Sequence, residues 1–366
     1  MSSSRYKLKE TFLTLIRLGI GHPVAIIPES IDWESIRDLA SEQGLSAIVL
    51  DGVQALTDRG GLVDGRAMDV TLKKQWIGNV IQNYEQQYAD YRKRLGQLAR
   101  FYQEHGFRLM VLKGYGLGLN YPVPQHRPCG DIDIWVFGKN KEADAVLSKE
   151  LGIPIDGSHH HHTTFTFQGY LVENHYDFLN VHYGHGNDRL ETILKGLAQD
   201  DLVQTEIDGQ AVYLPSANFH ALFILRHAMS HFASTKMNLR QVLDWAFLVE
   251  KHGKEIDWPW LLGILEEYHM LDFFHCLNAI CISDLGFDVF LFPRFQFDVE
   301  LKDRLLNDIL FPEFDEPTPA GFFRRIPFKY RRWQANAWKQ DLCYGDSRFK
   351  SFWTGVWSHL LKPSMI

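Results

Sequence analysis

Two aspartates separated by one residue, Asp131 and Asp133, stand at the start of the apolar run 132–137. We interpret this run as a strand, and alternate side chains of a strand share a face, so both carboxylates would point the same way, about 6–7 Å apart along the chain. Two like charges held this close need a cation. Mg²⁺ suits them because it prefers carboxylate oxygens and shares its coordination sphere with nucleotide phosphates. A lone Asp-x-Asp is common in surface turns, so the neighbouring residues decide the interpretation.

Upstream of the aspartates, the sequence has the pattern of a phosphate-binding turn. Residues 107–112 predict a strand that delivers Lys113 and Gly114 to a turn, followed by a short helix. Glycine lets a ligand approach the backbone closely, and the free amides at a helix start suit phosphate oxygens. A loop rich in proline then places Arg127 just before the acidic pair, where its guanidinium could hold a phosphate or pair with the aspartates. We therefore expect Lys113, Gly114 and Arg127 to bind nucleotide.

The order of these pieces, a strand, Lys113-Gly114, a short helix, Arg127 and then Gly-Asp-Ile-Asp, resembles the uncharacterised nucleotidyltransferase family of the bacterial Pol β-like nucleotidyltransferase superfamily. The resemblance covers roughly residues 30–250. It implies an α+β fold in which a Pol β-like core, a small mixed sheet with flanking helices, lies between helical N- and C-terminal regions. The superfamily's usual phosphate turn is Gly-Ser or Gly-Gly, and Lys113-Gly114 is the variant that this family shares.

The resemblance also implies a third acidic residue on a neighbouring strand. The family's acidic-x-His strand favours Glu173 as that carboxylate, with His175 beside it and Asp177 in reserve. On a strand over 170–178 these three side chains would share one face. A half-exposed strand with polar outer positions is the alternative interpretation, since antiparallel sheet edges show the same alternation.

Two further groups of histidines are candidates for the cleft or for a metal. His227 and His231 have helical i, i+4 spacing, but Ala228 stands where a His-Glu-x-x-His protease needs its glutamate, which disfavours zinc hydrolysis. They would either be core histidines or line the cleft. His159–His162 lack the fixed spacing of a metal motif, and we interpret them as loop residues near the active face.

The chain divides into three predicted regions. They are a helical N-terminal region over 1–88, a nucleotidyltransferase α/β core over 89–215, and a helical C-terminal region over 216–366 with a basic aromatic tail. A long helix is expected at 80–105. The strands of the core are expected at 107–112, 132–137, 163–167, 170–178, 202–207 and 210–214.

Composition predicts a globular protein of the cytoplasm. The chain has 366 residues and 45% hydrophobic content, enough for a large core. It has no apolar run of 18 residues and its first residues lack the pattern of a signal peptide, so we expect no membrane partner. The four cysteines show no CxxC spacing, which predicts reduced thiols instead of a zinc ribbon or a disulfide framework.

The tail is the basic part of an acidic chain. Residues 324–362 carry nine Lys or Arg and two Asp, a net charge of +7, whereas the whole chain carries −7 and the remainder therefore −14. Four tryptophans are interleaved with these charges, which suits a nucleic acid or another polyanion. A helical tail that packs its aromatic side chains on the body and leaves its basic groups in water is the plainer interpretation.

The resemblance implies a Mg²⁺-dependent nucleotidyltransferase that moves a nucleoside monophosphate from a nucleoside triphosphate, ATP or another, to an unidentified hydroxyl acceptor. Asp131 and Asp133 would hold two Mg²⁺ ions, with Mn²⁺ as an alternative, and Glu173 would complete the catalytic carboxylates. Two other hypotheses stay open. One is an RNA-associated toxin-like or regulatory protein that binds through 324–362, and the other is a nucleotide-binding module without catalysis.

Overall fold

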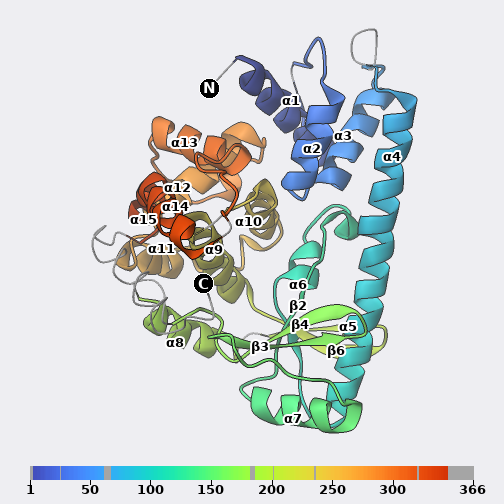
Figure 1. Cartoon of the computed structure of the whole chain (residues 1–366), viewed down its shortest axis with the longest axis vertical. Helices are drawn as coiled ribbons and strands as arrows, with labels where there is room; N and C mark the ends of the chain where they lie inside the picture. Colours follow the sequence, from blue (N-terminus) through green and yellow to red (C-terminus); the bar gives the residue numbers. More distant parts are fainter. Residues whose placement is uncertain are drawn as a thin grey trace.

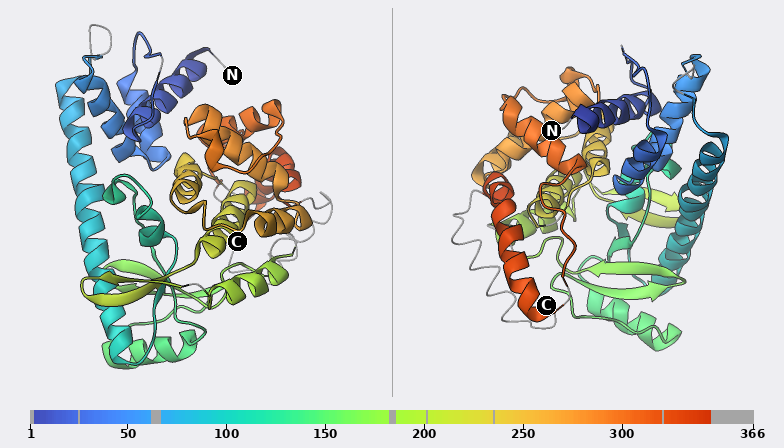
Figure 2. Two further views of the ribbon diagram at one scale, coloured as in Figure 1. Left: turned by 180° about the vertical axis from the view of Figure 1, so that it is seen from behind. Right: turned by 45° about the horizontal axis from the view of Figure 1, so that its top comes forward.

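We describe a computed structural model of the chain (Figure 1). It describes residues 3–24, 26–61, 67–181, 186–200, 202–234, 236–319 and 321–344. Helices from both ends of the chain lie side by side, and the sheet lies against the long helix (Figures 1 and 2). This mixed α/β arrangement confirms the predicted fold class. In the described part of the chain no helix is long and apolar enough to cross a bilayer.

The N-terminal region is helical, as predicted. Its first three helices are α1 (Ser3–Gly19), α2 (Trp33–Glu42) and α3 (Ser46–Asp58). The predicted N-cap of α2 is confirmed, because the Asp32 carboxylate accepts a hydrogen bond from the Ser35 amide at 3.2 Å.

The long helix is longer than predicted. Helix α4 (Val70–Val80), a π-helical segment (Ile81–Gln86) and α5 (Gln87–Glu104) follow one another without a break. Helix α5 buries one face against the sheet, including Tyr91. The boundary predicted between residues 88 and 89 falls inside this helix, so the N-terminal region and the α/β core share an element.

A six-stranded mixed sheet forms the α/β core in the described residues. Its spatial order is β3-β4-β2-β1-β6-β5. The β2–β4 and β1–β6 pairs are parallel and the other three pairs are antiparallel. The strands are β1 (Met110–Val111), β2 (Ile132–Trp135), β3 (His162–Phe167), β4 (Tyr170–His175), β5 (Val203–Ile207) and β6 (Gln210–Leu214).

The first strand is shorter than the predicted 107–112. The Phe107 amide donates to the Tyr102 carbonyl at 2.9 Å and so closes helix α5, with Gly106 at φ +77° in between. This hydrogen bond is part of the C-terminal end of helix α5, so residue 107 does not belong to the strand. Met110 and Val111 pair with β2, and Met110 also pairs with β6.

The described residues of the C-terminal region are largely helical, as predicted. Helix α10 begins with a capping box between Asn238 and Gln241, and α11 carries Pro259 in its first turn. Within the core lie α6 (Gly114–Gly118), a 3₁₀ turn (Pro124–His126), α7 (Asn140–Leu151) and α8 (Asn187–Leu197). Beyond it lie α9 (Ala217–Ser234), α10 (Leu239–His252), α11 (Trp258–Glu267), α12 (Leu271–Ala279) with a π-helical segment (Ile280–Asp284), a 3₁₀ turn (Val289–Leu291), α13 (Val299–Leu310), α14 (Phe322–Ala335) and α15 (Ala337–Tyr344).

Two hydrophobic clusters organise the molecule. One unites the N-terminal helices, the C-terminal helices and one face of the sheet, and the other fills the space between the sheet, α5 and α7. Gln43 ties the two ends of the chain together, because its side-chain amide donates to the Ile309 carbonyl at 3.0 Å and accepts from the Leu239 amide at 2.8 Å. The C-terminal helices α9 and α10 are thereby held opposite the strands that carry the aspartates.

Candidate active site

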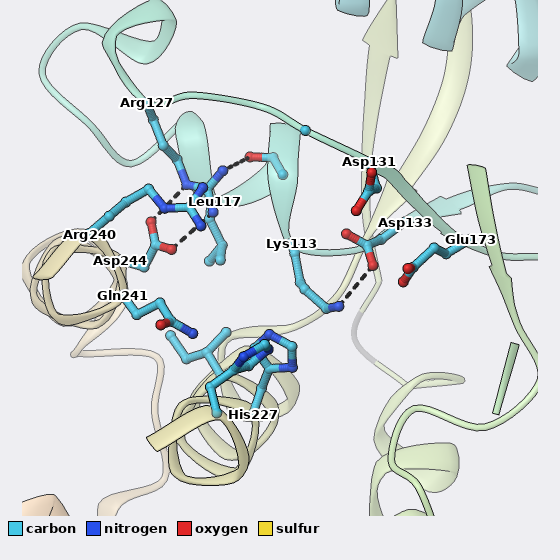
Figure 3. A pocket seen from close by; sticks show the side chains of 14 residues that line it. Lys113, Leu117, Arg127, Asp131, Asp133, Glu173, His227, Arg240, Gln241 and Asp244 are labelled. Atoms are coloured by element: carbon cyan, nitrogen blue, oxygen red, sulfur yellow. Dashed lines mark hydrogen bonds and ion pairs between the residues drawn. The ribbon is translucent and has the colours of Figure 1, made fainter. Parts of the chain in front are cut away.

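Carboxylates from two neighbouring strands converge at one cavity. Strands β2 and β4 are parallel and Asp133 is in register with Glu173. Asp131 precedes β2 by one residue, yet its carboxylate reaches the same space, and all three side chains line a cavity of about 290 Å³ (Figure 3). The register places the carboxylates where the sequence predicts a shared face. Their role as metal ligands stays a prediction.

The turn after β1 brings a cation to these carboxylates. Lys113 is the N-cap of α6 and has φ +37°, a backbone conformation uncommon for a residue with a Cβ. Its ammonium donates to Asp133 Oδ1 at 2.8 Å, with only 17% of the lysine side chain and 10% of the aspartate side chain exposed. The turn therefore places the Lys113 ammonium next to the Asp133 carboxylate.

Gly114 is required by a close approach of helix α5. A Cβ added at Gly114 would lie 2.8 Å from the Tyr91 hydroxyl, which itself donates to the Asp131 carbonyl at 3.4 Å. The Tyr91 hydroxyl of α5 thus lies against both the Gly114 turn and the backbone of Asp131.

We expect Gly114→Ala to lower the free energy of unfolding by about 1–3 kcal/mol, the usual cost of overpacking. Removing the clashing hydroxyl by Tyr91→Phe in the same chain should recover most of that loss, because the next ring atom lies 3.7 Å away. Denaturant unfolding of the two single variants and the double variant measures the coupling. Strictly additive losses would contradict the close approach.

The two aspartates have opposite electrostatic environments. Partial burial, followed by repulsion from Glu173 and Asp133, raises the pKa of Asp131. Burial also opposes ionisation of Asp133, but the nearby Lys113 ammonium and the hydrogen bond from His175 hold its pKa well below the usual range. The surroundings therefore stabilise the ionised form of Asp133 and destabilise the ionised form of Asp131.

Glu173 and His175 both lie beside Asp133. The Nε2 atom of His175 is 3.2 Å from Asp133 Oδ1 and 3.5 Å from Glu173 Oε2. Burial lowers the basicity of this imidazole, but the two carboxylates outweigh it and raise the pKa of His175. Of the two candidates for the third carboxylate, Glu173 is the one that lines the cavity.

The shared face expected for Asp177 is wrong. Strand β4 ends at His175, so strand alternation does not extend to Asp177. Its carboxylate instead makes an ion pair with Lys195 of α8. Its backbone carbonyl faces the Nδ1 atom of His175 at 3.2 Å.

Arg127 is held in a buried ion pair. Its Nε and Nη2 atoms donate to the two oxygens of Asp244 at 2.7 and 2.9 Å, and its Nη1 donates to the carbonyls of Gly114 and Pro128 at 3.1 and 3.2 Å. The Tyr121 hydroxyl donates to the same carboxylate at 2.7 Å. Among the described residues Arg127 pairs with Asp244 and not with Asp131 or Asp133. It also contacts the Gly114 carbonyl, and nucleotide binding by Arg127 stays a prediction.

Helices α9 and α10 form the wall that faces the carboxylates. His227 and His231 project from α9, and Arg240 and Gln241 from α10, and all four line the cavity (Figure 3). His227 and His231 were expected either in the core or in the cleft, and in the structure both line the cavity. Burial, followed by the positive charge of Lys113, lowers the pKa of both imidazoles, so these two side chains are neutral donors and acceptors at neutral pH.

Arg240, Gln241 and Asp244 are cavity residues to which the sequence assigned no role. The available signal was the polar positions 240, 241 and 244, which precede the buried apolar run 245–249 of the same helix.

The histidines expected in a loop reach the site as well. His162 begins β3 and is 5% exposed, and its Nε2 atom lies 3.7 Å from Glu173 Oε1. Burial lowers the pKa of His161 to about 3 and that of His162 to about 4, so both rings are neutral at neutral pH.

The described part of the tail packs on the body. Trp338 contacts the ring of Phe232 with centroids 5.4 Å apart, and Lys339 makes a buried ion pair with Asp308 at 2.5 Å. The Arg332 guanidinium donates to the Ser234 carbonyl at 2.7 Å. These contacts favour the packing interpretation for 321–344. The remainder of 324–362 lies outside the described residues, and binding of nucleic acid there stays a prediction.

Comparison with known proteins gives two matches. The model of a family described as uncharacterised nucleotidyltransferase matches residues 29–283, a range that contains every residue lining the cavity. No curated protein matches the chain. Among solved structures, that of an antigenic nucleotidyltransferase-like protein from Paracoccidioides brasiliensis is similar over 43% of this chain and 75% of that one, with 14% identity and a TM-score of 0.31.

Proposed function

Because the chain belongs to the uncharacterised nucleotidyltransferase family, we propose that it transfers a nucleoside monophosphate from a nucleoside triphosphate to a hydroxyl acceptor. One observation carries the proposal. Carboxylates from the segment before β2, from β2 and from β4 converge with a lysine from the β1–α6 turn in a single cavity. This set is suited to bind metal ions and phosphates together.

The carboxylates fit divalent cations. Asp131, Asp133 and Glu173 offer oxygen ligands, and burial, followed by repulsion from Glu173 and Asp133, raises the pKa of Asp131; a cation would relieve the repulsion. Asp131 and Asp133 would hold the ions, as Mg²⁺ or Mn²⁺. When bound, the ions would supply charge stabilisation to the attacking oxygen and to the pyrophosphate that leaves.

The side chains around the carboxylates have separate tasks in this proposal. Glu173 orients the acceptor hydroxyl and takes its proton as the acceptor oxygen bonds to the α-phosphorus and the bond to pyrophosphate breaks. Lys113, whose ammonium lies at 2.8 Å from Asp133, would contact the phosphates when the carboxylates hold cations. Arg127 holds the Gly114 carbonyl at 3.1 Å and so keeps the turn in place.

The α9–α10 wall would receive the acceptor. His227 and His231 are neutral, and with Gln241 they can donate to or accept from hydroxyl groups. The volume, about 290 Å³, lies at the small end of ligand pockets, which span about 300–1,000 Å³. It would enclose the reacting ends of both substrates and leave the rest of each outside.

Transfer is tested with labelled nucleotides. The protein is incubated with Mg²⁺, a cell extract and each nucleoside triphosphate carrying label on either the α- or the γ-phosphate. We expect α-label, and not γ-label, to appear on an acceptor that mass spectrometry then identifies, and the Asp131→Asn/Asp133→Asn variant to transfer none. Transfer of γ-label would mean a kinase. Tight metal-dependent binding without transfer would favour the non-catalytic module, and absence of binding would refute the proposal.

A further inference from the structure

Three imidazoles gather next to the carboxylates. Strands β3 and β4 are antiparallel with His162 in register with His175, and His161 immediately precedes β3. The ring centroids of His161 and His162 are 4.3 Å apart, those of His162 and His175 5.2 Å, and those of His161 and His175 5.7 Å. One nitrogen of each ring lies within 4.8 Å of the others, a spacing at which the three can share a metal ion.

The nitrogens of His161 and His162 are buried without hydrogen bonds. Both ring nitrogens of His162 and the Nδ1 atom of His161 are inaccessible and have no hydrogen-bond partner in the described part of the chain. Buried polar atoms in folded proteins are nearly always satisfied, so each such group calls for an explanation.

The orientation of His175 also suits a metal ligand. Its Nδ1 faces the Asp177 carbonyl at 3.2 Å and its Nε2 faces Asp133 Oδ1 at 3.2 Å, so both nitrogens point at acceptors. A hydrogen bond from Nδ1 to a backbone carbonyl is the usual support of a metal-binding histidine, because it directs the Nε2 lone pair at the ion.

Glu173 places its carboxylate beside two of the three imidazoles. Its Oε1 lies 3.7 Å from His162 Nε2 and its Oε2 lies 3.5 Å from His175 Nε2. Three imidazoles and one carboxylate are a poor set for Mg²⁺, which demands oxygen, but they match Zn²⁺, Co²⁺ and other divalent transition metals.

We propose that His161, His162, His175 and Glu173 bind a divalent transition-metal ion with a preference for nitrogen ligands. The site is adjacent to the proposed Mg²⁺ ligands Asp131 and Asp133 and shares only Glu173 with the three proposed catalytic carboxylates. Its existence depends on the histidines and not on nucleotidyl transfer.

Metal binding tests the site without an activity assay. The chelated full-length protein is titrated with Co²⁺, followed by visible absorption, and then loaded with Zn²⁺ for X-ray absorption spectroscopy. We expect one equivalent of Co²⁺ to give ligand-field bands that excess Mg²⁺ does not remove. The Zn²⁺ spectrum should show about three imidazole ligands, as the His₃-carboxylate set requires. Zn²⁺ should also raise the Tm of the wild-type protein.

Variants assign the ligands. His162→Leu should weaken Co²⁺ binding at least about tenfold, as loss of metal-site support does. It should not lower the Tm of the metal-free protein, since the nitrogens it removes have no hydrogen bonds. Asp131→Asn should bind Co²⁺ as wild type does. His105→Asn is the matched control and should also bind Co²⁺ normally. It alters a histidine that is not among the proposed ligands and whose Nε2 lies 2.8 Å from a glutamate oxygen.

Three results would overturn the proposal. They are a metal shell of oxygen atoms alone, unchanged affinity in His162→Leu, and loss of binding in His227→Gln, which would move the site to the α9 histidines. If His162→Leu fails to fold, the imidazole count of the wild-type Zn²⁺ spectrum decides by itself. Failure here leaves nucleotidyl transfer untouched, because the α-label assay measures that activity separately.

Discussion

Asp133→Asn is expected to lower the rate of nucleotidyl transfer by roughly 10³-fold or more. A metal ion contributes several kcal/mol of charge stabilisation in such reactions, and each 1.36 kcal/mol is a factor of ten in rate. The amide also breaks the ion pair with Lys113, leaving that ammonium partly buried without its partner at 2.8 Å. Steady-state kinetics with the labelled nucleotide measures the first effect, and thermal unfolding in a chelator measures the second.

Asp131→Asn is the matched variant, with the same loss of activity and the opposite change in Tm. The pKa of Asp133 is depressed, so its ionised form stabilises the fold at neutral pH, and this contribution is lost as pH falls through the folded-state pKa. The pKa of Asp131 is raised, so its ionised form costs stability at neutral pH, and the cost fades on acidification. In metal-free protein at pH 7, Asp133→Asn should lower the Tm and Asp131→Asn should raise it.

Equal shifts of Tm for the two variants would contradict this assignment of charges. The difference between Asp131→Asn and wild type should also shrink as the pH falls to about 4, where carboxyls in the unfolded chain protonate. A difference that persists there would trace the effect to packing instead of charge.

Asp244→Asn is expected to have the largest effect on stability, about 3–5 kcal/mol, the typical cost of removing one partner of a buried ion pair. Arg127 would keep its positive charge with 5% of its side chain exposed, and would face a neutral amide with one acceptor oxygen in place of the carboxylate. The Gly114 turn, which Arg127 holds through a carbonyl, should lose its position, so nucleotide affinity should fall together with stability.

Two controls separate these effects. The Arg127→Met/Asp244→Leu variant removes both charges and should recover most of the lost stability but not the nucleotide affinity. Asp308→Asn breaks a comparable buried pair with Lys339, away from the cavity, and should cost stability with unchanged nucleotide affinity. Equal affinity losses in Asp244→Asn and Asp308→Asn would mean that Arg127 acts only through global stability.

Much of the fold could be predicted because its signals are local. The hairpin of β5 and β6 shows strand alternation on either side of Asp208-Gly209, and both turn residues have positive φ. Helix α4 lies in the region predicted as helical, but its continuity with the long helix was missed because only Trp76 and Val80 of its residues are buried, so no apolar stripe marks it. The extent of β1 depends on partners on either side, which no local pattern encodes.

The site divides in the same way. Alternation and the family resemblance bring Lys113, Asp133 and Glu173 together, and these residues come from strands that pair directly or the turn beside them. The partner of Arg127 could not be predicted, because Asp244 lies 117 residues away on another helix. Asp177 was misplaced because strand alternation holds only while the strand lasts, and β4 ends two residues earlier.

The place of β1 in the sheet has a consequence for the order of synthesis. This strand lies between β2 and β6, and its partner β6 is made roughly a hundred residues later. When Asp131 and Asp133 have just been synthesised, the sheet therefore still lacks β6. Helix α10, which forms part of the cavity wall, is synthesised later still. Pairing between distant segments is slow to form. Ribosome-bound chains should accordingly acquire nucleotide binding only after residue 252, the end of α10, has left the exit tunnel.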